Sequence, residues 1–237
     1  MFYIDWSYII LVMPFVILSL LASAKVNSSF KKYSQSYSRR GLTAAEAARK
    51  VLQDNGVLDV NVERVRGHLT DHFDPKANVI RLSENVYDST SVASIGVACH
   101  EAGHAVQHAV GYLPVKVRTA IVPITNIGSK LSIPLVLLGI LLSSFGEQYS
   151  IIAYIGVALF ALCVVFQLVT LPTEFNASRR ALRAINDGGI LDSDEAVGAK
   201  KVLTAAAMTY VAALAVTVMQ FLRLLLIVAG SQQRRRR

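Results

Sequence analysis

The stretch VACHEAGHAVQHAV, residues 97–110, contains the pattern His-Glu-x-x-His, with His100 and His104 four residues apart. Side chains at this spacing lie on one face of an α-helix, so the two imidazoles can bind one metal ion. Glu101 would lie beside the first ligand, within reach of a water that zinc polarises. Its carboxylate could take a proton from this water and pass it to a leaving amine. The pattern predicts zinc-dependent hydrolysis of peptide bonds.

The same pattern also arises by chance, so an alternative interpretation is a polar stripe on an amphipathic helix that binds no metal. That alternative leaves three histidines and a glutamate on an otherwise apolar helix. Burying these polar groups costs free energy and would have no evident purpose. We therefore favour the metal site.

The pattern supplies two ligands, and a third must come from elsewhere. His108 follows on the same stretch, but three residues at i, i+4 and i+8 of a straight helix cannot all reach one metal ion. Metzincins place a glycine turn at the position that Gln107 occupies here, so their pattern fails. We interpret His108 as an outer or surface residue.

Glu174, in the segment LPTEFNASRRAL, is the better candidate for the third ligand. It follows an apolar stretch and would begin a polar helix capped by Thr173. Together with His100 and His104 it would form the two-histidine, one-glutamate set of thermolysin-type zinc enzymes.

The composition indicates a membrane protein. Of 237 residues, 53% are apolar and only 17% are charged, below the roughly 25% that is usual in soluble domains. The net charge of +8 is concentrated after the first apolar run and in Arg234–Arg237. This placement indicates membrane orientation and contact with lipid headgroups, and no nucleic-acid recognition motif accompanies it. Cys99 and Cys163 form neither a CxxC pair nor a disulfide framework.

Apolar runs predict the membrane spans. Residues 6–24 are long enough to cross a bilayer, with Pro14 as a kink. Lysines and arginines follow this run and none precedes it, so the chain from residue 25 onward is expected in the cytoplasm. Residues 131–145 and 151–171 predict a hairpin with an outside tip. The last run, 203–230, could cross once or bend back as a hairpin, and we favour one crossing.

Between these spans, short patterns predict a mixed α and β domain. TAAEAARKVLQDNG predicts a helix with a capping box of Thr43 and Glu46, after a basic linker at 25–42. LDVNVERV and VIRLS predict strands, and residues 92–110 predict the helix that carries the motif. We predict an α-helical multi-pass membrane protein with a small cytoplasmic α+β zincin-like domain. The expected parts are an anchor (6–24), the zincin-like part (25–118), an interfacial segment and hairpin (119–171), a cytoplasmic helix with the third ligand (172–202), a C-terminal apolar helix (203–230) and a basic tail (231–237).

The stretches HEAGHAVQ, EFNASRRAL and DHFDPKANVIRLSENVY, with the two-span hairpin, resemble the YugP-like bacterial membrane zinc metallopeptidases over nearly the whole chain. The resemblance implies Zn²⁺ as cofactor and a multi-pass location in a bacterial cell membrane. The layout is more distantly similar to HtpX-type peptidases, which have an aspartate four residues after the glutamate to orient a ligand histidine. Here that position is Ser178, whose hydroxyl accepts a hydrogen bond but carries no charge.

The resemblance also implies that residues 79–83 form the edge strand over the metal helix, to which an extended peptide could add. It does not identify the group that stabilises the oxyanion. The candidates for outer-sphere or substrate contacts are Ser178, Arg179, His72, His108 and Tyr112, with Tyr87 as a further candidate for the oxyanion.

The sequence therefore predicts an endopeptidase that acts on membrane or misfolded proteins at the cytoplasmic membrane surface. An ATP-driven protease is excluded because the chain contains no G-x-x-x-x-G-K-[ST] motif. An intramembrane site-2-type protease, with Asp187 in NDGG, remains an alternative, as does a non-enzymatic zinc-binding adaptor or scaffold. The expected partners are the lipid bilayer and peptide or protein substrates, with an accessory membrane subunit or a second copy of the chain left open.

Overall fold

The structure is a computed structural model that describes residues 6–67 and 70–233. Most of the predicted basic tail, Arg234–Arg237, therefore lies outside the described residues. The chain folds into two compact units. The first contains the described residues of 1–21, 117–171 and 210–237, and the second contains 22–116 and 172–209. All residues of the predicted site belong to the second unit.

Helix α3 (Ala44–Asp54) forms one wall of the second unit. The predicted capping box is present, because the Thr43 hydroxyl accepts the Glu46 N–H while the Glu46 carboxylate accepts the Thr43 N–H. Its inner face is built of small side chains, namely Ala44, Ala45, Ala47 and Ala48, which are fully or almost fully buried. These alanines let neighbouring helices approach closely and contribute to one apolar core.

A three-stranded sheet completes this unit, with β1 (Asn61–Val65), β2 (His72–Asp74) and β3 (Val79–Ser83) in the order β1-β3-β2. β3 runs parallel to β1 and antiparallel to β2. The expectation that β3 is an edge strand is therefore wrong. The error arose because β2 has only three residues and ends directly before Pro75, too short to show an alternating pattern.

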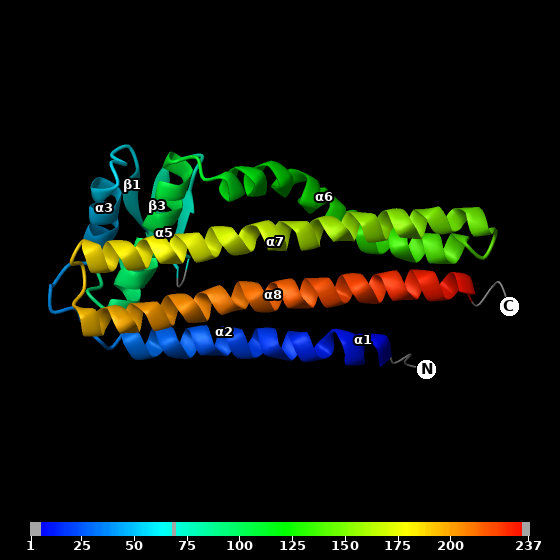
Figure 1. Cartoon of the computed structure of the whole chain (residues 1–237), viewed down its shortest axis with the longest axis horizontal. Helices are drawn as coiled ribbons and strands as arrows, with labels where there is room; N and C mark the ends of the chain where they lie inside the picture. Colours follow the sequence, from blue (N-terminus) through cyan, green and yellow to red (C-terminus); the bar gives the residue numbers. More distant parts are fainter. Residues whose placement is uncertain (1–5, 68–69, 234–237) are drawn as a thin grey trace. The chain divides into compact units, whose positions relative to one another are not determined.

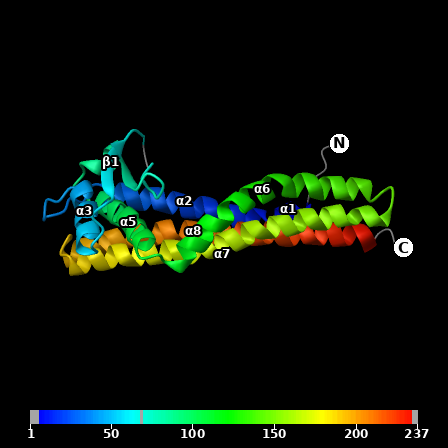
Figure 2. The same cartoon turned by 90° about the horizontal axis from the view of Figure 1, so that it is seen from above.

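Helix α5 (Val92–Ala109) carries the His-Glu-x-x-His pattern, as predicted, and begins at Ser91, whose hydroxyl accepts the Ser94 N–H. Two glycines on α5 mark close approaches to other helices of the same unit. A Cβ on Gly96 would lie 3.3 Å from the Cβ of Ala199, and a Cβ on Gly103 would lie 2.7 Å from the backbone oxygen of Ala177. Figures 1 and 2 show α5 beside α3 and the sheet.

The remaining elements include four long helices, α2 (Met13–Tyr33), α6 (Leu113–Leu142), α7 (Ser150–Asp187) and α8 (Ser193–Gln233). The short ones are the helices α1 (Trp6–Leu11) and α4 (Glu84–Tyr87) and the 3-10 turn η1 (Glu147–Tyr149). In the first unit, buried side chains of α6, α7 and α8 share an apolar cluster that includes Val136, Val157 and Leu224. Four helices of the described chain are long and apolar enough to cross a membrane: Met13–Tyr33, Leu113–Leu142, Glu147–Asp187 and Ser193–Ser231.

The bounds of three helices can be compared with the segments predicted from the sequence. α2 continues to Tyr33, into the predicted linker. α7 passes through Pro172 without a break, so the prediction that Thr173 caps a separate helix is wrong. Pro172 removes one backbone hydrogen bond, whereas ending the helix there would leave several carbonyl groups without donors. The run that could cross once or bend back is one continuous helix in α8.

Candidate metal centre

The structure brings His100 and His104 of α5 together with Glu174 of α7. The two Nε2 atoms lie 3.1 Å apart, and Glu174 Oε2 lies 3.4 Å from the first and 3.5 Å from the second. The Glu174 side chain is buried, and both imidazoles are partly buried. Two helices far apart in the sequence thus present three ligand atoms to one point.

The three atoms fit a zinc ion. Zinc takes nitrogen and oxygen ligands at about 2.0–2.2 Å in tetrahedral geometry, which separates neighbouring ligand atoms by about 3.3 Å. The observed separations of 3.1–3.5 Å lie around that value. Three protein ligands leave the fourth position for water or substrate, which is typical of catalytic rather than structural zinc sites.

Gly103 sets the distance between the two helices that carry the ligands. It stands between His100 and His104 in the chain, and a Cβ at this position would lie 2.7 Å from the Ala177 carbonyl oxygen on α7. Real Cβ atoms do not approach a backbone oxygen so closely, so only glycine permits this approach without a shift of α5 or α7. Glu174 and Ala177 are three residues apart and share one face of α7.

Each imidazole is held through its other ring nitrogen. Ser178 Oγ lies 3.1 Å from His100 Nδ1, and Gln107 Oε1 lies 3.0 Å from His104 Nδ1. An imidazole that donates from Nδ1 keeps its Nε2 lone pair for the metal. Ser178 occupies the position where HtpX-type peptidases have an orienting aspartate, and its hydroxyl lies beside the ring of His100.

Gln107 is the residue that sequence reasoning missed, because in the sequence it stands out only as a departure from the metzincin pattern. It is completely buried, and its Nε2 donates to the Thr173 carbonyl oxygen at 2.8 Å and to Asn176 Oδ1 at 3.0 Å. These two donations orient the amide so that its oxygen faces His104. The sequence does contain one indication of this role: Gln107 is three residues after the ligand His104, and residues at that spacing lie on the same helix face.

Glu101 is fixed by the edge strand of the sheet. Its Oε2 accepts a hydrogen bond of 3.0 Å from the backbone N–H of Phe73 in β2. In an antiparallel ladder alternate residues turn their N–H groups away from the neighbouring strand, and Phe73 does so here. The strand that the sequence did not predict therefore positions the predicted general base.

Burial of the His104 ring by itself lowers its pKa. The hydrogen bond to Glu174 and the negative charges of Glu101 and Glu174 outweigh this, so the pKa of His104 lies above its ordinary value. The same negative charge favours a metal cation. Cys99, next to His100 in the chain, is buried in the apolar core, where desolvation raises its pKa to about 12. It stays a neutral thiol and belongs to the packing of α5.

The other candidate residues lie outside the three-ligand cluster. His108 is exposed, with its ring centroid 5.8 Å from that of Phe73. His72 is exposed on β2, with Nδ1 2.7 Å from the Thr70 carbonyl oxygen, and Arg179 is exposed on α7. The backbone N–H of Tyr112 donates to the Gln107 carbonyl oxygen where α5 ends, and the Tyr87 hydroxyl accepts from Arg49.

Comparison with known proteins identifies the family of the chain. A family model described as "Putative neutral zinc metallopeptidase" matches residues 8–229, and the chain belongs to this family of zinc metallopeptidases. Among individual proteins, the chain is 47% identical over 210 residues to the "Putative membrane protease YugP" of Bacillus subtilis (strain 168), covering 89% of this chain and 91% of that protein. No solved structure matches significantly.

Substitution of Gly103 by alanine tests the helix contact. The added Cβ must push α5 from α7, so we expect the zinc dissociation constant to rise at least tenfold and unfolding free energy to fall by about 1–3 kcal/mol. Chelator competition and thermal unfolding measure the two effects. Gly230→Ala is the matched control because a Cβ there meets nothing within 4 Å. Wild-type zinc affinity in Gly103→Ala would contradict the role of the contact.

Substitution of Gln107 by leucine tests how His104 is oriented. The leucine keeps the volume but removes the acceptor for Nδ1, so zinc affinity should fall by about 10–100-fold. Isothermal titration with Zn²⁺ measures this loss. Gln53→Leu, at an exposed position of α3, is the control and should bind zinc as the parent does. Equal affinities of both variants would show that Gln107 only fills space.

Proposed function

We propose that this protein is a zinc-dependent endopeptidase that cleaves peptide bonds of membrane or misfolded proteins at the cytoplasmic membrane surface. The observation that carries the proposal is the convergence of His100, His104 and Glu174 beside a carboxylate that is not itself one of the three ligands. Membership of a zinc metallopeptidase family supports the same reaction class.

The chain's own residues divide the work of hydrolysis. Zinc, when bound, would supply Lewis-acid chemistry, polarising a carbonyl group and making a water acidic near neutral pH. His100, His104 and Glu174 would hold the ion. Glu101 would take the proton from the attacking water and deliver it to the nitrogen of the departing amine. The Phe73 N–H keeps the Glu101 carboxylate oriented at 3.0 Å before substrate arrives.

The edge of β2 offers a place for an extended substrate. Because β3 is central, it cannot accept an added strand, but β2 pairs with β3 on one side only. The Phe73 N–H faces away from β3 and already donates to Glu101, and the carbonyl of the same residue, which points to the same side in an antiparallel strand, is the group that could receive a substrate N–H. A peptide that added to β2 would place its backbone beside the general base, through hydrogen bonds that do not depend on substrate sequence.

Features of the chain around the site support the proposed location. Glu174 stands three residues after the apolar stretch that ends at residue 171, and the basic residues between 172 and 202 favour the cytoplasmic side. The relative in Bacillus subtilis is named a membrane protease. In contrast with a site-2-type enzyme, α5 is not among the four candidate spans in the described chain.

Substitution of Glu101 by glutamine separates an enzyme from a zinc-binding scaffold. The amide cannot accept the proton, so cleavage of a labelled unfolded protein should fall at least 100-fold while one zinc per chain remains bound. Cleavage assays and metal analysis measure the two quantities. Glu84→Gln, at an exposed position of α4, should retain parental activity. Undiminished cleavage by Glu101→Gln would refute the proposed base.

Introduced cysteines test the membrane side, in a background where Cys163 is alanine and the buried Cys99 is kept. A membrane-impermeant maleimide should label Gln148→Cys, in the turn between α6 and α7, in intact cells. Glu63→Cys on β1 and Ala109→Cys at the end of α5 are exposed positions of the second unit, so the reagent can reach them once the membrane is opened. It should label them only after lysis, because the proposal places them in the cytoplasm. Labelling of Glu63→Cys in intact cells would reverse the orientation, and protection of Ala109→Cys after lysis would favour an intramembrane site.

A further inference from the structure

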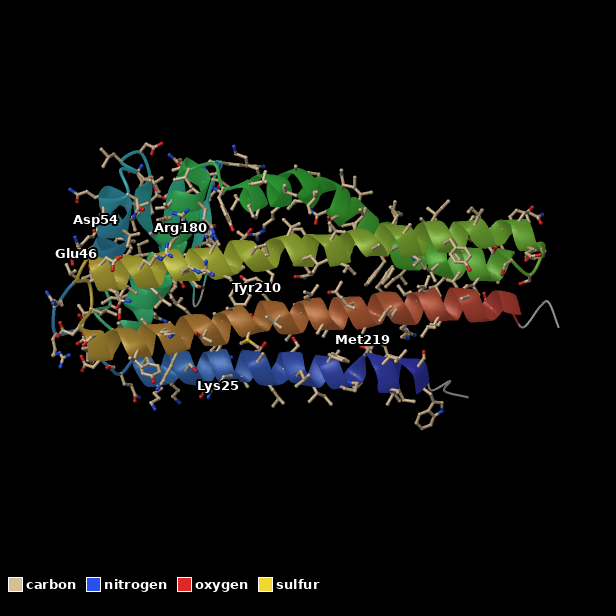
Figure 3. All side chains as sticks on the ribbon, in the orientation of Figure 1. Lys25, Glu46, Asp54, Arg180, Tyr210 and Met219 are labelled. Atoms are coloured by element: carbon tan, nitrogen blue, oxygen red, sulfur yellow. The ribbon has the colours of Figure 1, made fainter. Side chains whose placement is uncertain are left out.

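A groove separate from the metal centre lies within the second unit, between α2 and α8. Its cavity volume is about 710 Å³, within the range of small-molecule sites. Residues of α2 from Ala22 to Tyr33 and of α8 from Val197 to Met208 line it. Both helices are candidate membrane spans, and Figure 3 labels Lys25 on the α2 side of the groove.

The groove is strongly cationic. Lys25 and Lys32 of α2 and Lys200 and Lys201 of α8 all line it, and no acidic residue is among its lining residues. None of the four lysines forms an ion pair with any residue that the structure describes within 4.0 Å. Four lysines along one groove, with no carboxylate among the lining residues, give it a positive potential that would stabilise a bound anion.

The nearby acidic groups do not neutralise the groove, because they bind other cations. Asp192 and Glu195, just before and inside the first turn of α8, accept hydrogen bonds from the Arg39 guanidinium and the Arg39 N–H respectively. Asp194 also pairs with Arg39, and Asp192 pairs with Arg40. These contacts fasten the chain after α2 to the start of α8 and leave the lysines as the uncompensated charges.

The lining also changes in polarity along the groove. Ser29 and Thr204 add hydroxyl groups, which donate to phosphate oxygens, near the lysines. Ala22, Ala205 and Met208 line the end from which each helix continues into its apolar stretch. Gly198 makes the close packing of the two helices possible, since a Cβ there would lie 2.7 Å from the ring of Tyr33. The lining thus matches an amphiphile with an anionic head and apolar chains.

We infer that this groove binds the headgroup of an anionic phospholipid, such as phosphatidylglycerol. The phosphate lies among the four lysines, and the acyl chains leave past Met208 along the apolar stretches of α2 and α8. An acidic protein segment would satisfy the lysines but not the apolar end, and free phosphate would use only the cationic part. The inference rests on the proposed membrane location of the protein.

Lipid binding by the full chain in neutral-detergent micelles tests the inference. Fluorescent phosphatidylglycerol, labelled on an acyl chain, is titrated at about 0.1 M ionic strength, with phosphatidylcholine carrying the same label as the zwitterionic comparison. Each lysine near a phosphate contributes about fivefold in affinity, so Lys200→Gln/Lys201→Gln should weaken phosphatidylglycerol binding by roughly 25-fold. Lys200→Arg/Lys201→Arg should stay within about threefold of the parent, because the charge remains.

The matched control is Lys31→Gln/Lys76→Gln, which removes the same charge from exposed positions outside the groove and should change binding less than twofold. All variants should bind zinc as the parent does, which verifies their folding. Equal binding of both lipids, or equal loss in groove and control variants, would overturn the inference. Inorganic phosphate that binds as tightly as phosphatidylglycerol would assign the groove to free phosphate and also overturn the inference, because the acyl chains would then contribute nothing to binding.

Failure of the lipid inference is distinguishable from failure of the proposed location. If the chain is recovered in the soluble fraction of carbonate-washed cells, the membrane location is wrong. If the chain stays in the membrane fraction but does not discriminate between the two lipids, only the inference about the groove is wrong.

Discussion

The contact of α5 with α7 at Gly103 is the constraint on which the metal centre depends. Two ligands come from α5, but the third comes from α7. The distance between these two helices must therefore allow all three side chains to reach one metal ion. Gly103 has no Cβ, and one added there would lie 2.7 Å from the backbone oxygen of Ala177, so the side chain at this position must be absent. Small residues also line other contacts in this core, on the alanine face of α3 and where Gly96 of α5 meets Ala199 of α8. This close packing helps to fix the distances between the three ligand atoms.

That close packing puts polar groups where water cannot compensate them, and the surrounding residues satisfy them instead. His100 is bonded through Ser178, and His104 is bonded through Gln107, whose amide is fixed in turn by α7. Glu101 receives a backbone N–H from β2. His100, His104 and Glu101 thus each have one atom bonded to the surrounding protein. Such a network is stable only when all its members are satisfied, and it specifies one arrangement of the site.

The parts that could be predicted from the sequence were those with local signals. A capping box marked α3, a cap and an unbroken apolar run marked α5, and the chemistry of zinc ligands indicated Glu174. The errors fall where tertiary contacts override local ones. β2 is too short for a pattern but is held by β3 and by Glu101, so β3 became central. α7 continues through Pro172 because backbone hydrogen bonding on both sides outweighs one lost bond. Gln107 was missed because the residues that orient its amide, Thr173 and Asn176, are 66 and 69 residues away in the sequence.

Helix α8 connects the cationic groove with the helix that carries the motif. Neighbouring residues on a helix point about 100° apart, and here Gly198 meets Tyr33 of α2 while Ala199 meets Gly96 of α5. The next two residues, Lys200 and Lys201, line the groove. The start of α8 is therefore packed against α2 through Gly198 and against α5 through Ala199, and it presents Lys200 and Lys201 to the groove. The groove, the Gly96 contact and the three-ligand cluster all belong to one compact unit.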